Sequence, residues 1–80
     1  MQARRLIRVE FGEHMNRESI DGMLGTLMAC GDMSHGPNGR IFFVEVRRPK
    51  SLAHLKETLL GWDHWGFVKW SERPDGPEIT

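Results

Sequence analysis

The residue types that could perform chemistry in this chain are four histidines, one cysteine and eleven carboxylates. Metal sites on helices need spacings such as His-x-x-x-His, which place two ligands on one face. No such pair exists among His14, His35, His54 and His64. Convergence of His35, His54 and His64 on a metal or small molecule is a minor alternative, and we expect neither a metal nor a cofactor.

Covalent catalysis needs a nucleophile, a base and an orienting group within hydrogen-bond reach. Cys30 is the only thiol, and it falls at the end of a predicted helix, where the dipole disfavours a thiolate. We expect it to be a small buried hydrophobe. Ser34 and His35 share a loop with Asp32, but sequence neighbours rarely form a triad. The Gly-rich turn at 36–39 lacks phosphate-loop spacing and precedes a strand. A non-enzymatic protein is the prediction.

Aromatic residues near the C-terminus favour surface recognition instead. Trp62, Trp65, Phe67 and Trp70 fall close together, and so short a chain has too small a core to enclose all three indoles. Because Trp and Arg are enriched at binding hot spots, we expect at least one Trp to face a partner, flanked by Lys69 and Arg73. The alternative is that two Trp fill the core edge and the third lies flat on the sheet.

The basic residues occur in two segments separated by an acidic one. Eleven Lys+Arg balance eleven Asp+Glu, which argues against a general polyanion binder. Residues 1–8 nevertheless carry a charge of +3, residues 9–39 carry −4 and residues 40–50 carry +3. If the two basic segments lie side by side, they could form a phosphate-contacting stripe; a solvated charged face is the alternative.

Hydrophobic periodicity predicts the elements that must position these residues. Segments 4–11 and 40–48 alternate as strands, the second with aromatic and β-branched bulk on both faces, as in a central strand. A helix is predicted from the N-cap Asn16 to Gly31. A short edge strand at 33–35 is left open.

The second half of the chain predicts one more helix and one more strand. Pro49 ends the strand before it, Ser51 is the expected helix cap and Gly61 the expected helix end. The last strand is predicted at 65–70, with Val68 and Trp70 on one face.

This order of elements predicts an α+β fold: the ferredoxin-like split βαβ arrangement, an antiparallel sheet with two helices on one face. Without a strand at 33–35, a three-stranded sheet with two helices remains. Residues 1–73 would form a single domain and residues 74–80 a solvated tail. The expected core is Ile7, Val9, Phe11, Ile20, Leu24, Leu27, Phe42, Val44, Val46, Leu52, Leu55 and Leu59.

Residues 39–46, Gly-Arg-Ile-Phe-Phe-Val-Glu-Val, resemble the signature octapeptide on the third strand of RNA-recognition-motif domains. The elements follow that family's order over residues 4–71. The resemblance implies an open sheet face that stacks the bases of single-stranded RNA on aromatic side chains. Its stacking positions fall on Ile41 and Phe43, and near Ile7 on the first strand; of these, Phe43 alone is aromatic.

We therefore expect a small binding protein that covers a surface of another protein, as inhibitors, adaptors and regulators of this size do, small phage anti-defence proteins among them. Binding of single-stranded RNA or DNA by Phe43, Arg8 and Arg40 is the alternative. The predicted contact residues are Arg8, Arg40, Phe43, Arg47, Arg48, Trp65, Lys69 and Trp70.

Two further expectations concern assembly and location. A homodimer could form through the open sheet face or the short edge strand. A lone cysteine suggests a reducing, cytoplasmic compartment. No apolar run approaches a membrane span, and the basic start is followed by too short an apolar stretch for a secretory signal.

Overall fold

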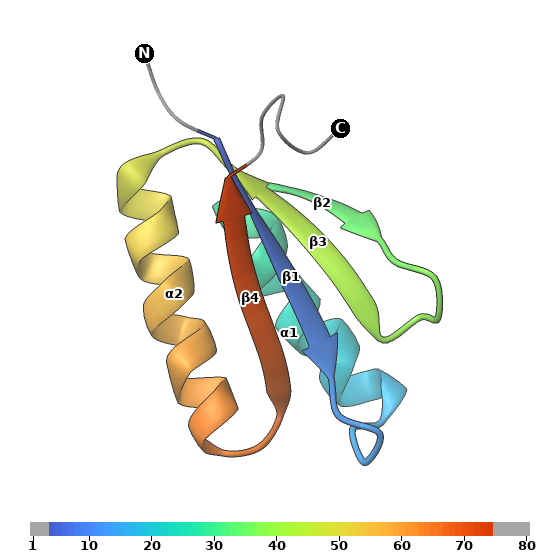
Figure 1. Cartoon of the computed structure of the whole chain (residues 1–80). Coiled ribbons are helices and arrows are strands. Elements are labelled where there is room, and N and C mark those ends of the chain that lie inside the picture. The colour runs from blue at the N-terminus through green and yellow to red at the C-terminus, as the bar shows by residue number, and fades with distance from the viewer. Residues whose placement is uncertain (1–3, 75–80) are drawn as a thin grey trace.

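The computed structural model describes residues 4–74, with side chains up to Glu72. Four strands form one antiparallel sheet in the order β2-β3-β1-β4, and both helices cover one of its faces (Figure 1). This is the predicted α+β, ferredoxin-like split βαβ arrangement. In chain order the elements are β1 (Arg5–Phe11), α1 (Arg17–Cys30), β2 (Asp32–His35), β3 (Ile41–Val46), α2 (Pro49–His64) and β4 (Val68–Pro74).

The two central strands divide their side chains between the faces as alternation predicts. The helix-covered face of β1 and β3 carries side chains that are almost wholly buried: Ile7, Val9, Phe11, Phe42, Val44 and Val46. Phe11 and Phe42 meet edge to face with ring centroids 5.7 Å apart, a favoured aromatic geometry. Leu24 and Leu52, also expected in the core, are only partly buried, whereas Met15, predicted in a loop, is buried.

The boundaries of α1 are confirmed. The Asn16 side chain accepts a hydrogen bond from the Ser19 backbone N–H at 2.8 Å, satisfying one free donor of the first turn. At the other end, a Cβ on Gly31 would collide with the Glu45 carbonyl oxygen. Glycine thus lets the chain pass from Cys30 directly into β2, without a loop between helix and strand.

The short strand that the sequence left open is present as β2. It pairs with β3 from Asp32, opposite Glu45, to His35, opposite Phe42. The sheet is therefore four-stranded, with β2 and β4 at its edges.

Both predicted ends of α2 were wrong. The helix begins at Pro49 rather than after Ser51, because the fixed φ of proline suits the first helical position, where no N–H is needed. It continues through Gly61, which has open space around it, since Trp62 still packs against the core. The chain leaves the helix at Gly66, whose φ of 79° is a conformation that glycine adopts without strain.

The last strand also differs from the prediction of 65–70. Residues 65–67 form the turn after α2, in which the Phe67 N–H donates to the Trp62 carbonyl at 2.9 Å. Pairing with β1 then extends β4 from Val68 to Pro74, beyond residue 70, where the alternating pattern predicted its end. The predicted tail, 74–80, lies outside the described residues except for Pro74, which ends β4. Neither described helix has the length and apolar character to cross a membrane.

Candidate functional site

The sheet face opposite the helices carries several of the predicted contact residues. Because directly opposed residues of antiparallel strands point to the same side, the registers of β1 with β3 and β4 assign its members. We call this surface the open face; it carries Leu6, Arg8, Glu10, Asp32, Ser34, Ile41, Phe43, Glu45, Lys69 and Ser71.

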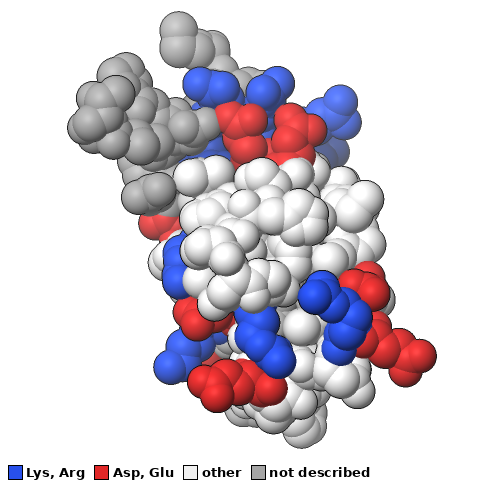
Figure 2. Space-filling view, turned by 90° about the vertical axis from the view of Figure 1, so that its right-hand side faces the viewer, with Lys and Arg blue, Asp and Glu red and all other residues white. Residues whose placement is uncertain are grey.

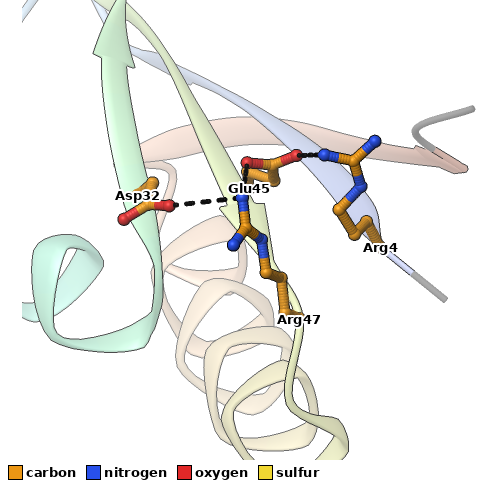
Figure 3. Close-up of polar contacts among 4 residues, drawn as sticks. All are labelled: Arg4, Asp32, Glu45 and Arg47. Carbon is orange, nitrogen blue, oxygen red and sulfur yellow. Dashed lines mark hydrogen bonds and ion pairs between the residues drawn. The ribbon is translucent and has the colours of Figure 1, made fainter. Parts of the chain in front are cut away.

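One end of the open face is an ion-pair network (Figure 3). The Glu45 carboxylate accepts from Arg4 at 3.0 Å through one oxygen and from Arg47 at 3.1 Å through the other. Arg47 also lies 3.9 Å from the Asp32 carboxylate. Exposed pairs of this kind contribute little stability each, but here they set two arginines against two carboxylates. The charges at this end therefore compensate one another.

The middle of the open face is less charged. Leu6, Arg8, Phe43 and Ser71 line a shallow hollow of about 260 Å³. Phe43 is half-buried and stands directly opposite Arg8 on the neighbouring strand. The Arg8 guanidinium is turned toward Glu10, with 3.2 Å between the paired atoms. A partly apolar hollow thus lies between ion pairs.

The structure brings together only part of the predicted contact set. Arg8, Phe43 and Lys69 share the open face, and Arg47 lies at its end. Arg48 is the exposed N-cap residue of α2. Arg40 donates to the carbonyls of Gly12 and Met15, at 2.8 and 3.0 Å, so it closes the loop after β1.

The two basic segments do lie on adjacent strands, as the stripe hypothesis requires, but their cations are dispersed. Arg5 is paired with Glu72, at 3.6 Å. Arg5 lies opposite Val46 and Glu72 lies opposite Ile7 in the strand registers, so this pair belongs to the helix-covered face. Arg4, Arg8 and Arg47 remain on or beside the open face, each with a carboxylate within 4 Å. A continuous cationic stripe does not form among the described residues.

The three tryptophans separate: one is exposed and two are partly buried. Trp62 and Trp70 pack partly buried against the core, and Trp70 stands opposite Val9, on the helix-covered side. Trp65 ends α2 with 71% of its surface exposed, its ring edge-on to that of His64 at 5.8 Å. It lies beyond the sheet, not flat on it. Trp65 is a second candidate contact, apart from the open face.

The chemistry-bearing residues of the described chain do not gather. Cys30 is buried, as predicted, and burial raises the pKa of its thiol, which disfavours the reactive thiolate. Between residues 4 and 74, no three His, Cys, Asp or Glu side chains are grouped so as to hold a metal ion.

Two features of the open face were not predicted from the sequence. Leu6 carries a usable signal, since it alternates in phase with Arg8 and Glu10. The network around Glu45 carries little, because Arg4 lies just before β1, Asp32 on β2 and Arg47 just after β3, and the contacts of Glu45 with Arg4 and of Arg47 with Asp32 depend on strand register. Comparison with known proteins adds no further guide: no protein-family model, no curated protein and no solved structure matches this chain.

Proposed function

We propose that this chain is a small, non-enzymatic binding protein that contacts another protein through its open face. The observation that carries the proposal is the charge pairing of this face. Its arginines are engaged by Glu10, Glu45 and Asp32, while the Leu6–Phe43 hollow remains accessible between them. An apolar centre within a polar, charge-balanced rim is the anatomy of a protein interface.

A nucleic-acid surface would show a different balance. Phosphate binding needs cations free to replace counterions, and carboxylates beside them oppose that exchange. Inhibitor, adaptor and regulator are the roles open to such a domain, and its single, buried cysteine suits a reducing, cytoplasmic setting.

A second candidate function rests on Phe43 standing opposite Arg8. An aromatic ring beside a guanidinium is a stacking platform for a base of single-stranded RNA or DNA, as the likeness to RNA-recognition-motif domains implies. This candidate predicts oligonucleotide binding that weakens steeply with salt. It also predicts a loss of about 1–3 kcal/mol for Phe43→Ala.

The experiment that tests the proposal is affinity capture from the cells that encode the chain, with quantitative mass spectrometry and with or without nuclease. Wild type, Phe43→Ala and Trp65→Ala are the baits. We expect a protein set that survives nuclease, is lost with Phe43→Ala and is kept with Trp65→Ala. Loss of the set on nuclease treatment would favour the nucleic-acid candidate. Equal recovery by wild type and Phe43→Ala contradicts binding at the open face.

A further inference from the structure

The outer edge of β2 presents backbone groups that the sheet leaves unused. β2 pairs only with β3, and the Gly36 N–H donates to the Ile41 carbonyl at 2.7 Å where the two strands meet their turn. Hydrogen-bonded and non-bonded pairs alternate along an antiparallel ladder. Counted from Gly36, this alternation directs the backbone N–H and C=O groups of Ser34 and Asp32 toward β3. It directs the N–H and C=O groups of Met33 and His35 outward.

This edge has few of the features that usually protect an edge strand. Natural sheets guard their edges with charged residues, prolines, bulges or a covering element. From Met33 to Gly39 the chain has no Lys, Arg, Asp or Glu, and the register with β3 runs without a bulge. Figure 2, which views the molecule from the β2 side, shows uncharged surface across the middle with charged residues above and below it. Besides its brevity, β2 has one charged residue, Asp32 at its start, and the nearest proline, Pro37, lies beyond its end.

A hollow beside this edge joins β2 to an exposed apolar side chain of α1. Met28 is 59% exposed and lines the same hollow as Asp32, the first residue of β2. The edge therefore offers both unpaired backbone groups and an adjoining exposed methionine.

We propose that two copies of this chain associate through β2, antiparallel, about a two-fold axis that passes at Ser34. In this register Met33 of each copy stands opposite His35 of the other. Each outward N–H then meets an outward C=O, and every one of these groups is used once. The four-stranded sheet becomes a continuous sheet of twice that width.

A second copy suits this edge because the register is self-complementary. Asp32 would face Gly36 of the other copy and Ser34 would face its equivalent, so no like charges are opposed. The formal charge of the chain is zero, and two copies therefore approach without net repulsion. A two-fold axis perpendicular to the sheet also keeps the helices of both copies on one side. The two open faces would adjoin, which presents two partner sites together.

The test uses a single cysteine at the axis, in a Cys30→Ala background. Ser34 of each copy would occupy a non-hydrogen-bonded site, where opposed Cα atoms lie about 4.5 Å apart, within disulfide reach. Under a mild oxidant we expect Ser34→Cys to form a covalent dimer on a non-reducing gel. Ser71→Cys is the matched control, because it is also an exposed serine of the open face but lies on β4. It should remain mostly monomeric.

A second pair of substitutions isolates the backbone bond. His35→Pro removes an N–H that points outward and has no role in the β2–β3 ladder, whereas His35→Ala keeps it. With Ser34→Cys, the proline should abolish cross-linking and the alanine should preserve it, while circular dichroism checks the fold of both.

The proposal is overturned if Ser34→Cys cross-links no faster than Ser71→Cys, a comparison that does not depend on how the proline variant folds. Cross-linking that persists in a folded His35→Pro variant also contradicts it. If the edge instead receives a strand of another protein, the purified chain stays monomeric, and that result rejects self-pairing.

Discussion

The two edges of the sheet are built differently. β4 has seven residues, Val-Lys-Trp-Ser-Glu-Arg-Pro, with three charged residues and a terminal proline, and Glu72 is held by Lys56 of α2 and by Arg5. β2 has four residues, Asp-Met-Ser-His, and no charge after Asp32. Charge and proline discourage strand addition. The contrast indicates that one edge is closed to further strands and that the other is available for pairing.

The first way to probe this contrast is to remove the core support beneath the β2 edge. Phe42 is fully buried, and its ring packs against Phe11 and lies 5.3 Å from that of His35. Phe42→Ala should lower the free energy of unfolding by about 3–5 kcal/mol, through lost burial and a residual cavity. Chemical denaturation measures this. Val68→Ala, at the start of β4, removes a smaller buried side chain and should cost clearly less; an equal cost would mean that the two edges rest on equivalent packing.

Adding a charge to β2, as β4 already has, should weaken self-association through β2, so that the two edges no longer differ. Ser34→Lys would place two ammonium groups opposite each other at the two-fold axis, and like-charge contact should weaken the dimer by about tenfold or more. Ser71→Lys adds the same charge at the other edge and should leave association unchanged. Sedimentation equilibrium over a concentration series compares the two, and identical dissociation constants would show that β2 is not the contact.

Removing charge from β4 tests the same contrast from the other side. The double substitution Lys69→Thr and Glu72→Thr removes one charge of β4 from the open face and one from the helix-covered face. Loss of the Glu72 pairs, which involve partly exposed side chains, should cost no more than about 1 kcal/mol. The strand then keeps only Arg73 and Pro74 as guards, and it should support assembly beyond the dimer, seen as a concentration-dependent rise in mass by light scattering. A variant that keeps the wild-type mass would show that these charges do not close the edge.

The smallest effect concerns Cys30, which immediately precedes β2 and has no counterpart at β4. Burial raises the pKa of its thiol above the ordinary 9.0, so the fold favours the neutral form. The stability that this contributes is present at lower pH and is lost as the pH rises above that ordinary value. Between pH 8 and about 10, wild type should lose slightly more stability than Cys30→Ala in denaturant titrations. An equal loss in both proteins would contradict the burial argument.

Much of the fold was predictable because local patterns agree with tertiary packing. Alternation in β1 and β3 and the Asn16 cap of α1 are signals that nearby residues carry. The ends of α2 and β4 were misplaced, since packing by Trp62 and pairing with β1 extended these elements beyond their own signals.

The site was less predictable, because it depends on contacts between distant strands. Alternation already placed Arg8 and Phe43 away from the core, on facing strands. The contact of Arg4 with Glu45 depends on the strand register. The hydrogen bonds from Arg40 to the Gly12 and Met15 carbonyls depend on the loop conformation. These contacts decide whether the face is charge-balanced or forms a cationic stripe.

Amide hydrogen exchange tests most directly whether the two edges differ. The outward N–H groups are those of Met33 and His35 on β2 and, by the same alternation from the Gly12–Phe67 hydrogen bond, those of Val68, Trp70 and Glu72 on β4. If β2 self-pairs, protection of Met33 and His35 should rise with protein concentration, while that of Trp70 stays constant. Fast exchange at Met33 and His35 at every concentration, in a protein whose core amides are protected, would contradict the account.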